Sequence, residues 1–126
     1  MRGERWPLSR PFAIARGRKI AAEVVVAEIE EGELRGRGEC VPYARYKESV
    51  DGVAAALEAA RPLIEAGLSR ADIARHIEPR AARNALDCAL WDLEAKLAGK
   101  PVWQLAGLAQ PKPLITAYTL SLDSPE

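Results

Sequence analysis

Residues 82–93 read Ala-Arg-Asn-Ala-Leu-Asp-Cys-Ala-Leu-Trp-Asp-Leu, and this stretch decides the fold of the chain. Its apolar residues recur at the helical period, which is typical of one buried face of an α-helix. We expect the helix to run from about Pro79 to Ala98 and to end at Gly99-Lys100-Pro101. The apolar stripe comprises Ala82, Leu86, Ala89, Leu90, Leu93 and Leu97.

The other side of this helix is not simply polar. It carries a second set of small or apolar residues, namely Ala81, Cys88, Trp91 and Ala95. A helix that is apolar on two sides must be covered on two sides. We expect one cover from the sheet and helices of the domain and the other from outside these segments. Arg83 and Asp87 are four residues apart, which is ordinary ion-pair spacing on a helix, so we interpret these two residues and Asp92 as structural rather than as a metal or acid–base site.

The residues before this helix predict a three-stranded antiparallel meander. The expected strands are Arg10–Ala15, Lys19–Glu30 and Leu34–Cys40, and the middle one contains the β-branched run Val24-Val25-Val26. The two connections are Arg16-Gly17-Arg18 and Glu31-Gly32, and glycine in each favours a turn.

Two further helices are expected between the sheet and the long helix. Ser49 or Asp51 can cap a helix that ends near Ala66, before Gly67. Ser69 followed by Asp72 resembles a capping box and predicts a short helix through His76-Ile77. The fold class is therefore α+β, with a three-stranded meander followed by a helical bundle.

The end of the chain has a different pattern. Leu114–Leu122 is typical of a strand, and the following Asp123-Ser124-Pro125-Glu126 is a helix-start signal. A strand followed by the start of a helix resembles one unit of a βα repeat. We therefore divide the chain into a domain of residues 1–112 and a segment of residues 113–126 that begins a βα unit.

The charge balance narrows the classes of partner. Lys+Arg and Asp+Glu both number 18, so the chain has no net charge to attract nucleic acid or an anionic membrane. No apolar run is long enough to span a bilayer, and the first residues lack a signal-peptide pattern. Cys40 and Cys88 show no metal or redox spacing, so we interpret both as reduced packing thiols of a cytoplasmic protein.

Four segments together resemble a known family. They are Pro11-Phe12-Ala13-Ile14-Ala15-Arg16-Gly17, Val24-Val25-Val26, Gly38-Glu39-Cys40-Val41-Pro42-Tyr43 and residues 82–93. They resemble the N-terminal part of the muconate-lactonizing branch of the enolase superfamily, and most of all the L-Ala-D/L-Glu dipeptide epimerases. The resemblance covers essentially the whole chain, and the loops at Arg16-Gly17 and Pro42-Tyr43 narrow it toward the epimerases.

The resemblance implies an N-terminal domain that caps a modified TIM barrel and closes two loops over the substrate. In the family, two barrel lysines move the α-proton and three barrel carboxylates hold Mg²⁺. None of these groups can be placed in this chain, in which Leu114–Leu122 would be the first barrel strand. We therefore expect no catalytic and no metal-ligating residue in this chain, and no activity from the chain alone.

The resemblance also assigns substrate-binding roles to four residues. Arg16 matches the loop arginine that meets the acidic end of the dipeptide, a role that suits its planar guanidinium, whereas Arg18 and Lys19 are weaker candidates. Tyr43 and Tyr46 would shape the pocket mouth and exclude water. Thr119 would touch substrate from the first barrel strand. The alternatives are a solvated turn for Arg16, loop packing for the tyrosines and a structural strand threonine for Thr119.

Other functions fit the same resemblance. Muconate cycloisomerase, o-succinylbenzoate synthase and N-acylamino-acid racemase share this capping domain, and membership of a superfamily does not settle the substrate. A non-catalytic module is a further alternative, in which a partner or a second copy covers the side of the helix around Cys88 and Trp91. We expect a homo-oligomer.

Overall fold

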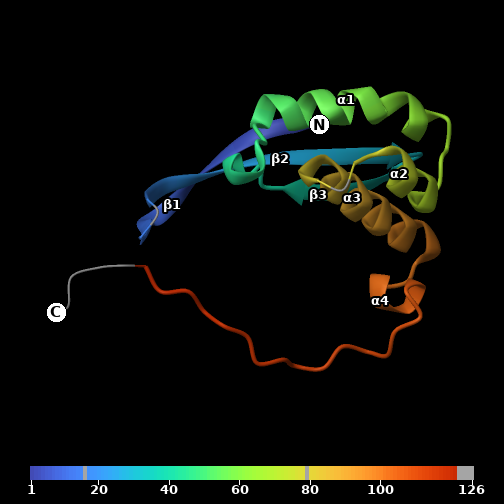
Figure 1. The fold of residues 1–126 in the computed structure, drawn as a ribbon. Helices are drawn as coiled ribbons and strands as arrows, with labels where there is room; N and C mark the ends of the chain where they lie inside the picture. The colour runs from blue at the N-terminus through green and yellow to red at the C-terminus, as the bar shows by residue number, and fades with distance from the viewer. Residues whose placement is uncertain (16, 79, 122–126) are drawn as a thin grey trace.

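The computed structural model describes residues 1–15, 17–78 and 80–121. Three strands form one antiparallel sheet in the order β1 (Arg2–Ile14), β2 (Gly17–Glu31) and β3 (Leu34–Cys40). The sheet is followed by a helical part, which confirms the α+β class and the meander (Figure 1).

The helices begin close to the residues expected from the sequence. They are α1 (Val50–Glu65), α2 (Arg70–His76), α3 (Ala81–Ala98) and α4 (Val102–Leu105), with a 3₁₀ turn at Ala44–Tyr46. The Ser49 hydroxyl caps α1 by accepting a hydrogen bond from the amide of Gly52 at 3.1 Å. At the start of α2, Ser69 and Asp72 form the expected capping box. Gly99 ends α3 in the left-handed conformation, as the sequence indicated.

The first strand is longer than the sequence predicted. It starts at Arg2, which pairs with Val26, and its register shifts between Pro7 and Phe12. The first part of β1 was not predicted because charged side chains interrupt the alternation of apolar and polar residues that is typical of a strand. In the sheet they pair with one another, since Arg2 contacts Glu28 at 2.6 Å.

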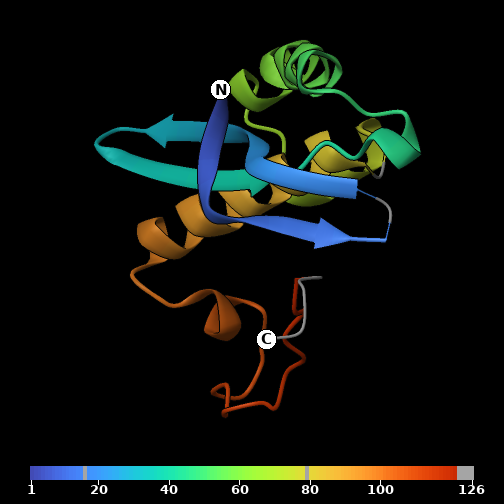
Figure 2. The same cartoon turned by 90° about the vertical axis from the view of Figure 1, so that its left-hand side faces the viewer.

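The core lies between the sheet and the helices α1, α2 and α3. Figure 2 shows α1 on one side of the domain and α3 lying along the strands. The buried cluster joins the middle and last strands to the helices through Val25, Ala27, Cys40, Val53, Leu57, Ala60, Ile73, Ala82, Ala85, Leu86, Ala89 and Leu90. The stripe on α3 that was expected to face the core does so, except that Leu97 is 47% exposed.

Two glycines let α3 lie directly on the backbone of β3. A Cβ atom added to Gly38 would lie under 3.0 Å from the backbone oxygen of Ala85 and the backbone nitrogen of Ala89. Gly36 meets the backbone of Ala89 and Leu93 in the same way. Any side chain at these glycines would force the helix and the strand apart.

The side of α3 around Trp91 is covered in part from within the chain, contrary to the expectation of an outside cover alone. The guanidinium of Arg70, on α2, lies 3.3 Å from the centroid of the Trp91 ring. Its Nε atom also donates to Glu94 at 2.9 Å. Cys40 and Cys88 are both free thiols, but Cys88 is exposed, so its interpretation as a packing residue was wrong.

The strand expected at Leu114–Leu122 is not formed over residues 114–121. Within that range the large side chains are exposed, from 78% at Leu120 to 104% at Ile115. A strand needs a neighbouring strand for its backbone hydrogen bonds, and among the described residues this segment is not paired with any strand of the sheet. Leu122 and the expected helix start at 123–126 lie outside the described residues.

The tail nevertheless returns to the sheet. It crosses the domain on the side away from α1 and ends beside β1 (Figures 1 and 2). There the amide of Ala13 donates to the hydroxyl of Ser121 at 2.9 Å, and that hydroxyl lies 3.4 Å from the carbonyl oxygen of Pro11.

Candidate functional site

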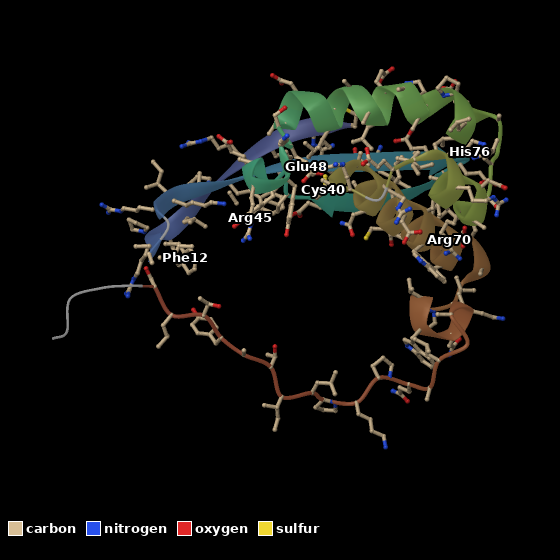
Figure 3. All side chains as sticks on the ribbon, viewed as in Figure 1. Phe12, Cys40, Arg45, Glu48, Arg70 and His76 are labelled. Atoms are coloured by element: carbon tan, nitrogen blue, oxygen red, sulfur yellow. The ribbon has the colours of Figure 1, made fainter. Side chains whose placement is uncertain are left out.

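A large hollow lies where the tail meets the β1–β2 hairpin. Its volume is about 1320 Å³, and its walls come from β1, from the first half of β2, from Val41-Pro42 and from residues 118–121. Figure 3 shows Phe12, one of the lining residues, at the end of the hairpin beside the returning tail. The hollow therefore brings together segments that are about a hundred residues apart in the sequence.

The charge of this hollow is mainly positive. Its charged lining residues are Arg5, Arg10, Arg18 and Lys19 against Glu23. A concave surface lined by one sign of charge raises the local concentration of ligands of the opposite sign. The hollow is therefore suited to an anionic ligand such as a carboxylate.

Thr119 lines this hollow, whereas Tyr43 and Tyr46 are not among its lining residues. The rings of Tyr43 and Tyr46 have centroids 5.8 Å apart, and both side chains are exposed. Lys19 links the two places, because it lines the hollow and its Nζ atom lies 5.5 Å from the centroid of the Tyr43 ring. The ring face is the electron-rich side that attracts an ammonium group.

Arg16, the residue expected to bind the acidic end of a dipeptide, lies outside the described residues. Its neighbours Ile14 and Gly17 pair with each other at the end of the β1–β2 ladder. The other loop cations, Arg18 and Lys19, are in the lining of the hollow. Sequence reasoning gave these two residues less weight than the structure does.

Glu48 was missed altogether. It is half-buried and joins the tyrosine loop to the start of α3, where its Oε1 atom accepts from the amide of Ala81 at 2.9 Å. The local sequence does not indicate a special role for Glu48, because an acidic residue before a cap residue such as Ser49 is common at helix starts. The contact is made across 33 residues and depends on the tertiary fold.

Asp92 has a structural role, as the sequence indicated. Its Oδ2 atom accepts from the Arg37 amide at 2.8 Å and from the Lys96 ammonium at 2.7 Å, which ties α3 to β3. The hydrogen bond from Lys96 is the main cause that lowers the pKa of Asp92. Burial, followed by the negative charge of Glu48, raises the pKa of the Cys40 thiol to about 11, so Cys40 is not a nucleophile at neutral pH.

Metal ligands are not gathered in the described part of the chain. No three His, Cys, Asp or Glu side chains there lie close enough to hold a metal ion. The described residues therefore do not fit a Mg²⁺ site. Within residues 1–15, 17–78 and 80–121, the helices are too short or too polar to cross a membrane.

Comparison with known proteins identifies this architecture. Residues 1–107 match the mandelate racemase / muconate lactonizing enzyme N-terminal domain. The L-Ala-D/L-Glu epimerase of Escherichia coli K12 is 46% identical over 123 residues, which are 98% of this chain and 38% of that protein. The N-acetyl-D-glutamate racemase of a Pseudoalteromonas species is 36% identical over 107 residues, 82% of this chain and 33% of that protein.

Solved structures agree with these matches. An enolase family member from Agrobacterium tumefaciens with homology to dipeptide epimerases, bound to sodium and L-Ala-L-Glu, has a TM-score of 0.89 and 49% identity. The match covers 97% of this chain and 37% of that one. The dipeptide epimerase of Methylococcus capsulatus, complexed with Mg and L-Arg-D-Lys, has a TM-score of 0.67 and 30% identity over 84% of this chain and 33% of that one.

The chain thus spans only 38% of the length of the epimerase and 33% of the length of the racemase. The part that it spans is the N-terminal part, with the three-stranded sheet and helices of the matched domain. The chain belongs to the mandelate racemase / muconate lactonizing enzyme N-terminal domain family and corresponds to the N-terminal domain of dipeptide-epimerase-like proteins of the enolase superfamily.

Proposed function

We propose that this chain is the substrate-capping domain of an enzyme that epimerises L-Ala-D/L-Glu dipeptides by moving the proton at the α-carbon. The observation that carries the proposal is the cation-lined hollow beside the β1–β2 hairpin, which suits the carboxylates of glutamate. The similarity to the Escherichia coli L-Ala-D/L-Glu epimerase supports the same substrate class.

Four residues would bind this substrate. Arg16 would hold the side-chain carboxylate of the glutamate unit, because a guanidinium can bind a carboxylate through two hydrogen bonds. Tyr43 and Tyr46 would close the mouth of the pocket and exclude water. Thr119, in the wall of the hollow, would donate or accept one hydrogen bond with the substrate.

The proton transfer itself would be done by other parts of the protein. We divide the chain into a cap of residues 1–112 and a segment of residues 113–126 that becomes the first strand of a catalytic barrel and the start of the following helix. The exposed apolar side chains of residues 114–120 support this division, because a barrel would bury one face of them. The proton-transferring lysines and the carboxylates that hold Mg²⁺ would lie on that barrel.

The test uses the natural reading frame that carries this chain together with its barrel. With L-Ala-L-Glu in deuterated water, we expect loss of the α-proton signal of the glutamate unit in ¹H NMR spectra. Arg16→Ala should lower kcat/KM about 100-fold, because a charge-paired contact to substrate is lost. Arg61→Ala, which alters an exposed arginine on α1, is the matched control. The 126-residue chain alone should exchange nothing, and an inactive complete protein would refute the proposal.

A second candidate is racemisation of N-acylated glutamate. The 36% identity to an N-acetyl-D-glutamate racemase favours it. Both substrates contain glutamate with an acylated amine, so the same hollow could serve either. The candidates are separated by measuring kcat/KM of the complete protein with four substrates, namely L-Ala-L-Glu, N-acetyl-glutamate, muconate and the precursor of o-succinylbenzoate.

The assembly and its place in the cell are also proposals. We expect a cytoplasmic homo-oligomer in which the part of α3 around the exposed Cys88 lies near an interface. Sedimentation equilibrium of the complete protein at several concentrations tests the oligomer, and a monomer at all of them would contradict it. A monomeric, inactive protein that instead binds another protein through this side of α3 would favour the non-catalytic alternative.

A further inference from the structure

The start of α3 lacks the usual cap from its own sequence. Its N-cap residue is Arg80, whose side chain accepts no hydrogen bond from the first turn. The first amides of a helix need acceptors from outside the helix, and a carboxylate is the favoured one because of the helix dipole. Glu48 supplies it from a distance, with Oε1 2.9 Å from the amide nitrogen of Ala81.

The second oxygen of the same carboxylate holds the tyrosine loop, defined here as residues 41–47. Its Oε2 atom accepts from the amide of Tyr43 at 3.2 Å. Arg80 adds another tie, because its Nη1 atom donates to the carbonyl oxygen of Tyr46 at 2.9 Å. Figure 3 shows Glu48 between this loop and the core residue Cys40. One carboxylate thus joins the loop to the first turn of the best-packed helix.

The tyrosine loop has a fixed backbone conformation, so a shift at its contact with Glu48 would also move its side chains. The amide of Tyr46 donates to the carbonyl of Tyr43 at 2.8 Å, and Lys47 has a left-handed backbone with φ of 60°. A non-glycine residue holds that conformation only where its surroundings fix it. Movement of the Tyr43 amide would therefore move the ring of Tyr43 and, with it, the ring face that meets Lys19.

We propose that Glu48 is a positioning residue, which sets the tyrosine loop against the Lys19 side of the hollow by anchoring it to the N-terminus of α3. Glu48 is not among the residues that line the hollow. Its effect passes through Tyr43 to Lys19, which lines the hollow. The effect of Glu48 on substrate binding rests on the proposed function, whereas its effect on the position of the tyrosine loop does not.

The structural test uses the 126-residue chain and amide hydrogen exchange measured by NMR. Glu48→Gln keeps the shape but replaces one acceptor oxygen with a donor, and Glu48→Ala removes both. We expect exchange at Tyr43, at Ala81 or at both to become about tenfold faster, in line with the loss of one hydrogen bond to a charged group. The amide of Gly52, bound to Ser49, is the internal control and should not change. Unchanged exchange at Tyr43 and Ala81 in both variants would overturn the proposal.

The functional test uses the complete protein and separates positioning from stability. For Glu48→Gln we expect KM for L-Ala-L-Glu to rise about fivefold to tenfold while kcat stays within about twofold, the pattern of lost ground-state and transition-state binding alike. Glu65→Gln, an exposed acid on α1, has the same change of charge and should leave both constants unaltered. A lower Tm of Glu48→Gln with an unchanged KM would overturn positioning in favour of a purely structural cap.

The two tests fail separately. If the wild-type protein turns over none of the substrates, the proposed function is wrong, and the exchange experiment alone decides the role of Glu48. If the wild-type protein is active and exchange at Tyr43 and at Ala81 is unchanged in both variants, only the role of Glu48 is wrong.

Discussion

The face of α3 that packs on β3 and the tail at residues 114–121 both carry large apolar side chains, but the first is buried and the second is exposed. In the first, Leu86 is 5% exposed and Gly38 lets the two backbones touch. In the second, Leu114 is 89% exposed and no strand forms. The difference is the presence of a partner surface, since apolar residues stabilise a fold only when something covers them.

The largest effect should come from breaking the contact at Gly38. Gly38→Ala places a Cβ against the backbone of Ala85, which cannot move without shifting α3. We expect a loss of about 4 kcal/mol in the free energy of unfolding, measured by urea titration with circular dichroism. Gly52→Ala in α1 is the control, because its Cβ meets only the Ser49 hydroxyl at 3.1 Å, and it should change stability by at most about 1 kcal/mol. Equal effects of the two variants would contradict the close approach.

A matched pair of leucines tests the comparison directly. Leu86→Ala should cost about 3 kcal/mol, because it removes a buried side chain and leaves a cavity. Leu114→Ala removes the same atoms from an exposed position and should change the free energy of unfolding by less than about 0.5 kcal/mol. The comparison would be wrong if the tail variant in the 126-residue chain lost as much stability as the core variant in the same titration.

The polar tie between α3 and β3 should give a smaller, pH-dependent effect. The folded state lowers the pKa of Asp92, so its ionised form stabilises the fold above the ordinary aspartate pKa of about 4, and this stabilisation is lost as the pH falls through the lower folded pKa. Asp92→Asn should therefore be less stable than the wild type at about pH 6, and the difference in stability between the two proteins should be smaller at about pH 3. Urea midpoints at the two pH values measure this, and a constant gap would exclude the carboxylate as the cause.

The smallest effect on stability is expected from Ser121→Ala in the tail. It removes the hydroxyl that contacts Ala13 and Pro11, at an exposed place, and should alter the free energy of unfolding by less than about 0.5 kcal/mol. Chymotrypsin should nevertheless cut near Tyr118 several times faster, because the tail is less often held against β1. Identical cleavage of the variant and the wild type would mean that this contact does not hold the tail.

The helix α3 could be predicted from the sequence because its apolar residues recur at the helical period within one continuous stretch. The close approach at Gly36 and Gly38 could not, since glycine in a strand indicates either weakness or a backbone contact, and only the fold distinguishes them. The first part of β1 was missed for a related reason. Arg2 and Glu4 suggest a solvated end, and Glu28, the cross-strand partner of Arg2, is far away in the sequence.

The same limit applies to the site. Tyr43 and Thr119 were predicted through the resemblance, and their roles remain predictions. The contact of Lys19 with Tyr43 and the two hydrogen bonds of Glu48 join segments that are distant in sequence, so no local pattern records them. The strand predicted at Leu114–Leu122 is not formed over residues 114–121, because a sequence records the propensity of a strand but not the neighbouring strand that it needs.

The return of the tail to β1 has a consequence for how further chain would behave. Ser121 contacts Pro11 and Ala13, so the segment that runs from α4 through the tail is a closed loop. The entropy lost on closing this loop is therefore part of the folding free energy of the domain. The chain that follows Ser121 leaves from a point in the wall of the cation-lined hollow. It would meet that surface at a high effective concentration, so even a weak interface between the two parts would be largely occupied.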